Sequence, residues 1–173
     1  MLRGINLGSR NKVAMAELRT LVEALGAEDV KTYVQSGNVV FTLPAQAVSK
    51  LEKTLQDGIK KQFGLDVPVV VRTKEQLAKV RDNNPFRRKT KDPKALHVTF
   101  LAGKADAKGA KELSAQDWTP DQLAVKSTEV FLLCPNGYGV SKLGNAFLEK
   151  KLGVTATTRN WNTVNKLIEL AGG

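Results

Sequence analysis

The chain has 173 residues, of which 42% are hydrophobic and 25% charged, with a formal net charge of +10 at pH 7. These proportions are typical of a globular protein with its own core and argue against an intrinsically disordered chain. No run of about 18 apolar residues and no secretory leader is found, and the single cysteine, Cys134, excludes an internal disulfide or a multi-cysteine metal site. We therefore expect a cytoplasmic protein with no membrane segment, metal or cofactor.

The positive charge is concentrated in one stretch of the chain. Between Arg72 and Lys111 there are 12 lysines and arginines but four acidic residues. Such an asymmetry raises the local concentration of anionic partners, but it can equally serve as a solubilising surface. The composition leaves both interpretations open.

In chain order, the first half is predicted to have the order β-α-β-β-α-β. Runs of β-branched and aromatic residues predict strands, and apolar residues at helical spacing predict helices. Gly26 and Gly64 supply the C-terminal stops of the two helices, and Gly37 permits the positive φ of a tight hairpin. The strands are expected at residues 2–5, 30–34, 38–41 and 67–71, and the helices at 15–25 and 48–63.

A short helix and a basic segment follow. Thr73 and Gln76 are spaced as a capping box, which predicts a helix from about residue 74 to residue 83. The next segment combines turn-forming and basic residues, which is typical of a linker. We therefore predict a first domain at 1–84, a basic linker at 85–94 and a second domain at 95–173.

The second half repeats the same order of elements and adds a final helix. Its strands are expected at residues 97–101, 123–125, 130–133 and 154–158, and its helices at 105–113, 147–152 and 160–170. This order is that of the ferredoxin-like plait, in which two helices cover one face of a four-stranded antiparallel sheet. We predict an α+β fold of two such plaits (a duplicated β-α-β-β-α-β), each followed by a helix.

Three strings concentrate polar residues and glycine: LRGINLGSRNKV at 2–13, TYVQSGNVVF at 32–41 and TTRNWNTVNKL at 157–167. In these strings, and more weakly at 137–143, the chain resembles the bacterial family known as domain of unknown function 1697 (DUF1697). The resemblance extends over nearly the whole chain. It implies the duplicated plait, and it implies no established reaction.

The first string joins the first strand to the first helix, where free amides and the helix dipole favour an anion. It matches neither the P-loop nor the G-x-G-x-x-G pattern. A glycine-bearing turn with solvated basic residues would explain the same string. The candidate anion-binding residues here are Arg3, Asn6, Gly8, Arg10, Asn11 and Lys12.

The other two strings offer further candidates. Gln35, Ser36 and Asn38 can present amide and hydroxyl groups to a ligand, although a strand-connecting turn favours the same residue types. In the third string, Asn160 is placed to cap the last helix, and Trp161 is either a stacking platform or a packing residue. The third string's candidates are Arg159, Asn160, Trp161 and Asn162. We expect residues 3–12 and 159–163 to share one concave surface.

His97 and Cys134 have the residue types of a nucleophile pair. Both follow or begin apolar runs, however, which favours two buried structural residues. One histidine and one cysteine cannot make a zinc site.

The leading functional hypothesis is a protein that binds a phosphate-bearing ligand or nucleic acid. Its phosphate contacts would come from Arg87, Arg88, Lys89, Lys91 and Lys94. Base stacking on the first sheet is not expected, because its central strands carry Phe41 as their one aromatic residue.

Two hypotheses from other classes stay open. The first is an enzyme that holds a small anionic substrate between the two halves, with a clamp made by Arg3, Asn6, Asn38, Arg159 and Asn160. The second is a protein-interaction module. The sequence indicates no oligomeric state.

Overall fold

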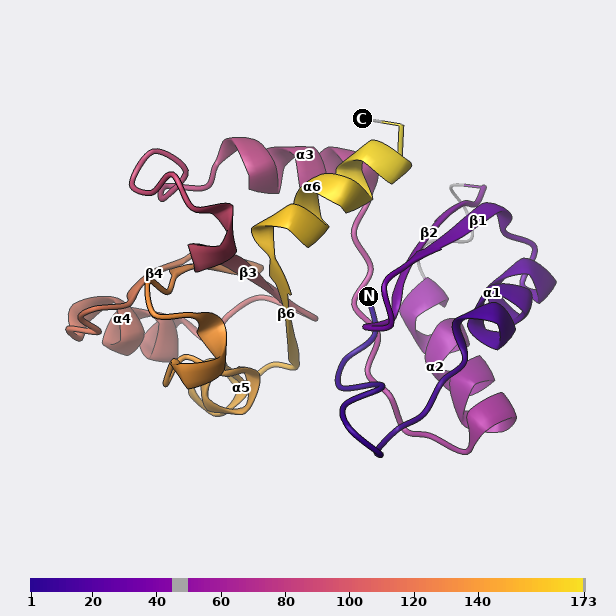
Figure 1. Ribbon diagram of the computed structural model, residues 1–173. Coiled ribbons are helices and arrows are strands. Elements are labelled where there is room, and N and C mark those ends of the chain that lie inside the picture. Colours follow the sequence, from indigo (N-terminus) through magenta and orange to yellow (C-terminus); the bar gives the residue numbers. More distant parts are fainter. Residues whose placement is uncertain (45–49, 173) are drawn as a thin grey trace. The chain divides into compact units, whose positions relative to one another are not determined.

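The protein is described by a computed structural model over residues 1–44 and 50–172. It has a mixed α+β fold, with antiparallel sheets of two and four strands and six α-helices in the described residues (Figure 1). The chain divides into two units, Met1–Val71 with Glu169–Gly173, and Arg72–Ile168. This division falls earlier than the boundary predicted at 85–94, so the short helix and the basic segment belong to the second unit.

The first unit contains two helices and a hairpin. They are α1 (Met15–Ala24), β1 (Glu28–Tyr33), β2 (Asn38–Thr42) and α2 (Leu51–Phe63). Strands β1 and β2 are antiparallel, with Tyr33 opposite Asn38. Helix α2 ends at Gly64, whose φ of 69° is the left-handed conformation predicted for this stop. The start predicted for this helix, at residue 48, lies outside the described residues.

The predicted strands at 2–5 and 67–71 are shorter than expected. The two segments meet in a single antiparallel bridge between Leu2 and Val69. Pro68 has no N–H to donate to a ladder, and Gly4 turns the chain away with a φ of 68°. Leu2 also donates its N–H to the carbonyl of Gly37 at 2.9 Å, so the segment lies beside the β1–β2 turn.

The second unit is built on a four-stranded antiparallel sheet in the order β4-β5-β3-β6. The strands are β3 (Leu96–Leu101), β4 (Gln122–Val125), β5 (Glu129–Leu133) and β6 (Ala156–Asn160). The helices are α3 (Lys74–Asp82), α4 (Ala107–Ala115), α5 (Asn145–Leu152) and α6 (Trp161–Leu170), with short 3₁₀ turns η2 (Pro93–Ala95) and η3 (Tyr138–Val140).

Both faces of this sheet are covered. Figure 1 shows α4 and α5 on one side of it and α3 and α6 on the other. All six residues of β3 are buried, and so are the last four residues of β5. Neighbouring residues such as Phe131 and Leu132 point to opposite faces of the sheet, so both faces are buried. Both β3 and β5 are central strands of the sheet, and side chains buried on both faces of a strand are what cover on both sides of the sheet requires.

A buried ion pair joins the start of the second unit to its sheet. Arg72 Nε lies 3.0 Å from Glu129 Oε1, and the two side chains are 9% and 15% exposed. The Arg72 Nη2 also donates to the carbonyls of Leu101 and Thr128, at 2.6 and 3.0 Å. These bonds fix the first residue of the unit to the ends of β3 and β5.

Candidate functional site

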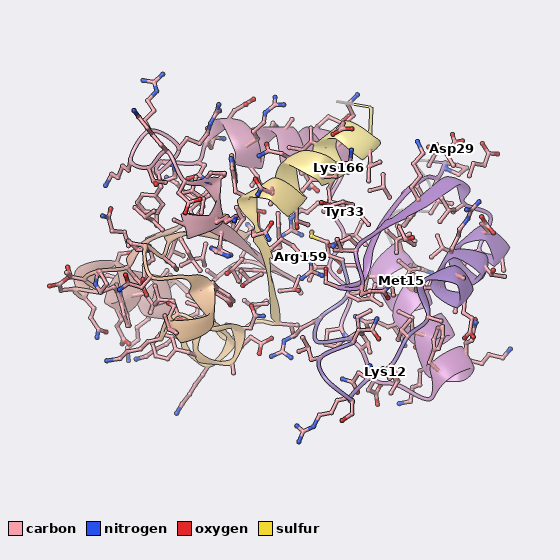
Figure 2. All side chains as sticks on the ribbon, in the orientation of Figure 1. Lys12, Met15, Asp29, Tyr33, Arg159 and Lys166 are labelled. Atoms are coloured by element: carbon pink, nitrogen blue, oxygen red, sulfur yellow. The ribbon has the colours of Figure 1, made fainter. Side chains whose placement is uncertain are left out.

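The loop that precedes α1 has an irregular backbone. Gly4, Asn6, Gly8 and Asn11 have positive φ angles, between 48° and 68°. Glycine and asparagine are the residues that adopt this left-handed conformation most readily. Their concentration in the first string therefore has a conformational cause. Figure 2 shows Lys12 on this loop.

Asn6 ties the loop to the turn between β1 and β2. Its Nδ2 donates to the carbonyls of Val13 and Gln35 at 2.9 and 2.8 Å, and its Oδ1 accepts the Val13 N–H at 2.9 Å. The Asn11 Nδ2 donates to the Gly4 carbonyl at 3.0 Å. Both amides are thus occupied by backbone groups, and the first two predicted strings lie side by side.

The β1–β2 turn is closely packed. Asn38 is fully buried, and its Nδ2 donates to the Tyr33 carbonyl at 3.1 Å and to the Ser36 hydroxyl at 2.9 Å. A Cβ on Gly37 would lie 2.7 Å from the Cβ of Leu2, closer than side chains pack. The composition of this turn is explained by packing and by its own hydrogen bonds.

Several predicted residues of the first unit do face solvent. The exposed candidates are Gly8, Arg10, Asn11, Lys12 and Gln35, whereas Arg3, Asn6 and Ser36 are half-buried. Two cations on a loop held by internal hydrogen bonds could meet a small anion without reordering. That these residues bind an anion stays a prediction.

The third string spans the end of β6 and the start of α6. Asn160 Oδ1 accepts the Thr163 N–H at 2.8 Å, which makes Asn160 the predicted cap of α6. Arg159 is buried, and burial lowers its pKa to about 10, so it stays charged at neutral pH. Its Nη1 donates to the Thr157 hydroxyl at 2.9 Å. Figure 2 labels Arg159 on β6.

The remaining candidates of this string differ in exposure. Trp161 is 7% exposed, as a packing residue would be, while Asn162 faces solvent. This string lies in the second unit and the loop at 3–12 in the first. A surface shared by the two stays a prediction.

The basic segment links α3 to β3 within the second unit, where its loop extends away from the sheet (Figure 1). All five predicted phosphate contacts are exposed: Arg87, Arg88, Lys89, Lys91 and Lys94. Within the described residues, Arg87 alone among them comes within 4.0 Å of a carboxylate, that of Asp82. Four of the five charges are therefore not neutralised by an ion pair.

The basic segment is better anchored than its sequence indicates. Phe86 is buried, and the Lys89 ammonium lies 5.2 Å from the centre of its ring. The Lys89 Nζ also donates to Gln122 Oε1 at 2.8 Å, and Asp92 Oδ1 accepts the Lys94 N–H at 2.9 Å. The segment is thus a hydrogen-bonded turn that presents its cations outward.

The second unit contains a polar cluster that the sequence does not predict. The Thr158 hydroxyl donates to Asn145 Oδ1 at 2.7 Å and accepts from the Tyr138 hydroxyl at 3.0 Å. Because the one proton of Thr158 is used, Thr99 must donate in their 2.7 Å contact. His97 stacks on Tyr138, with ring centres 4.9 Å apart. Tyr138 belongs to the weaker string at 137–143, and that string is a sequence feature that points to this cluster.

His97 and Cys134 have the structural character expected of them. Burial lowers the pKa of His97, and the backbone carbonyl of Ala95 opposes this shift. The pKa of Cys134 is raised to about 11, first by burial and then by the charge of Asp121, against a hydrogen bond with Ser141. The thiol is therefore protonated at neutral pH and is a poor nucleophile.

A small pocket opens beside the loop that leads into β4. Its volume is about 220 Å³, and its lining includes two carboxylates, of Asp117 and Asp121, and the ammonium-bearing Lys142. Asp121 accepts the Ser141 hydroxyl at 2.7 Å. Charges of both signs in one lining favour no particular class of ligand.

Two kinds of feature are not found within residues 1–44 and 50–172. None of the helices there has the length and apolar character needed to cross a bilayer. No group of three or more His, Cys, Asp and Glu side chains there is arranged to hold a metal ion.

Comparison with known proteins identifies relatives of this chain. A family model described as "Protein of unknown function (DUF1697)" matches residues 1–131. The structure is similar to that of the conserved bacterial protein SP0830 from Streptococcus pneumoniae, with a TM-score of 0.75 and 22% sequence identity, over 99% of this chain and 96% of that one. At this identity the likeness concerns the fold alone. No curated protein sequence matches the chain.

Proposed function

We propose that this chain, which belongs to the DUF1697 family of proteins of unknown function, binds a phosphate-bearing polymer through its basic segment. The observation that carries the proposal is the exposure of five cations on one short turn: Arg87, Arg88, Lys89, Lys91 and Lys94. Phosphate contacts of this kind position a ligand on the protein without selecting its sequence.

The charge balance around the segment supports this proposal. Asp82 contacts Arg81 at 3.0 Å and lies 4.0 Å from Arg87, so this carboxylate is shared by two cations. Asp92 uses Oδ1 to cap the turn that follows. The cations thus outnumber the acids near them, and their field acts over a Debye length of about 8 Å at physiological salt.

The anchoring of the turn also favours binding. A disordered basic tail must lose conformational freedom when it meets a ligand, and this loss weakens the complex. Here Phe86 is buried and Lys89 is hydrogen-bonded to Gln122. The turn therefore meets a polyanion with its backbone already ordered.

The test is a fluorescence-anisotropy titration of a labelled mixed-sequence oligonucleotide against the wild type and the Arg87→Glu, Arg88→Glu double variant. Binding should weaken as salt rises, and the double variant should flatten the slope of log K against log[salt] by about two. The matched control is Lys126→Glu, Lys150→Glu, which changes the net charge equally at exposed positions of the same unit. If the wild type binds neither the oligonucleotide nor inorganic polyphosphate at low salt, or if the control variant weakens binding as much, the proposal fails.

We also propose that the two units are versions of one plait. The second unit has the element order β-α-β-β-α-β and the strand order β4-β5-β3-β6. In the first unit, Leu2 is hydrogen-bonded to Gly37, the residue just before β2, and bridged to Val69, which is the corresponding arrangement. An experimental structure in which residues 2 and 69 belong to different sheets would refute this.

A further inference from the structure

We infer that the phosphate-bearing polymer is a double-stranded nucleic acid, gripped by its backbone rather than by its bases; this inference rests on the function proposed above. Proteins that bind single strands combine basic grooves with aromatic side chains on which bases stack. Proteins that bind duplexes can rely on phosphate contacts alone. The second unit has the cations and lacks the stacking surface.

The sheet of the second unit is not available to bases. In recognition modules built on a plait, bases stack on aromatic residues of the central strands. Here the central strands are β3 and β5, and their aromatic residues Phe100 and Phe131 are 0% and 2% exposed. Figure 1 shows helices over both sides of this sheet. A base could not reach either ring without displacing a helix.

The half-buried aromatic residues of the second unit are also engaged. Trp118 packs edge-on against Phe147, with ring centres 5.5 Å apart, and its Nε1 donates to the Leu113 carbonyl at 2.9 Å. Tyr138 is stacked on His97. The chain's ten aromatic residues all lie in the described part, and none is exposed.

The cations suit a duplex for a second reason. Double-stranded DNA carries about one charge per 1.7 Å of its axis, twice the density of one strand, so a short turn with five cations meets more phosphates on a duplex. With five phosphates neutralised, the slope of log K against log[salt] should be about −4.5 for duplex DNA. This slope corresponds to roughly a 500-fold loss of affinity when salt rises fourfold.

The experiment measures the full chain against four probes: a 20-base-pair DNA duplex, the RNA duplex of the same sequence, the single DNA strand, and inorganic polyphosphate. We expect at least one duplex to bind about tenfold more tightly than the single strand at 50 mM salt. A second duplex of scrambled sequence should bind with equal affinity, because phosphate contacts carry no sequence information. The two duplexes distinguish DNA from RNA as the source of the backbone.

Each outcome decides between the two proposals. If the single strand binds as tightly as the duplexes, or if polyphosphate binds and no nucleic acid does, the duplex inference is wrong and the proposed function stands. If no probe binds at low salt, both the duplex inference and the proposed function fail. The Arg87→Glu, Arg88→Glu variant should bind the duplex more weakly, with a salt slope flatter by about two, while keeping the wild-type urea midpoint, because both side chains are exposed. Equal duplex binding by this variant and the wild type would overturn the assignment.

Discussion

Among the glycines of the second unit, Gly109 is the one whose surroundings leave the least room for a side chain. It lies in the first turn of α4, and its N–H donates to Asp106 Oδ2, the cap of that helix. A Cβ built on Gly109 would overlap the carbonyl oxygen of Lys151, which is backbone and cannot rotate away. The close approach of α4 and α5 therefore depends on this glycine.

The expected cost of Gly109→Ala follows from two opposed effects. Alanine is favoured over glycine inside a helix by up to about 1 kcal/mol. Separating two packed helices to make room for a methyl group costs roughly 1–3 kcal/mol, and disturbing the cap costs about another 1 kcal/mol. We expect Gly109→Ala to lower the free energy of unfolding by about 2 kcal/mol, despite the better helix propensity.

Urea denaturation followed by tryptophan fluorescence measures this directly, because Trp118 and Trp161 both lie in the second unit. The control is Gly139→Ala in the same unit, where no atom lies within 4 Å of the added Cβ and the φ is not positive. The control should have the same urea midpoint of unfolding as the wild type. A Gly109→Ala protein as stable as the wild type would show that α4 and α5 do not pack as described.

Two further predictions concern buried charge. Arg72→Met should lower the free energy of unfolding by about 3–5 kcal/mol, because it leaves the Glu129 carboxylate buried without its cation. Adding Glu129→Met should recover part of this loss. If the urea-midpoint shifts of the two single variants simply add in the double variant, the pairing is contradicted. Burial lowers the pKa of His97 below its ordinary value of 6.5, so the unfolded chain binds the proton more tightly and stability should fall as the pH drops through about 6.5. An NMR titration of this single imidazole with a midpoint at or above 6.5 would contradict the second prediction.

Features set by local chemistry could be predicted from the sequence. The Thr73–Gln76 capping box is present with both of its hydrogen bonds, and Gly64 ends α2 in the left-handed conformation. The edges of β6 were misplaced by two residues, because Val154 and Thr155 have strand propensity while the ladder with β3 begins at residue 156. Propensity identified the strand, and pairing determined its ends.

Contacts between distant residues could not be predicted in this way. The Arg72–Glu129 pair joins positions 57 residues apart, and Asn6 reaches a carbonyl 29 residues away. Neither the residue type nor its spacing in the sequence predicts such a partner. The hydrogen bonds of Thr158 with Tyr138 and Asn145 could not be predicted for the same reason. Taken alone, each residue has a type that is ordinary for its loop, strand or helix.

Polar composition and exposure point to different parts of this chain. The strings at 2–13 and 32–41 stand out because polar residues and glycine concentrate in them, yet the side chains of Asn6, Asn11 and Asn38 hydrogen-bond to the protein's own groups. A side-chain amide that is already hydrogen-bonded within the protein contributes to folding and offers less to a ligand, because binding would first have to break those bonds. The cations at 87–94 face solvent and, apart from Arg87, have no carboxylate within 4.0 Å among the described residues. These cations can therefore pair with a ligand without first breaking an ion pair within the protein. Substitutions in the basic segment test ligand binding most directly.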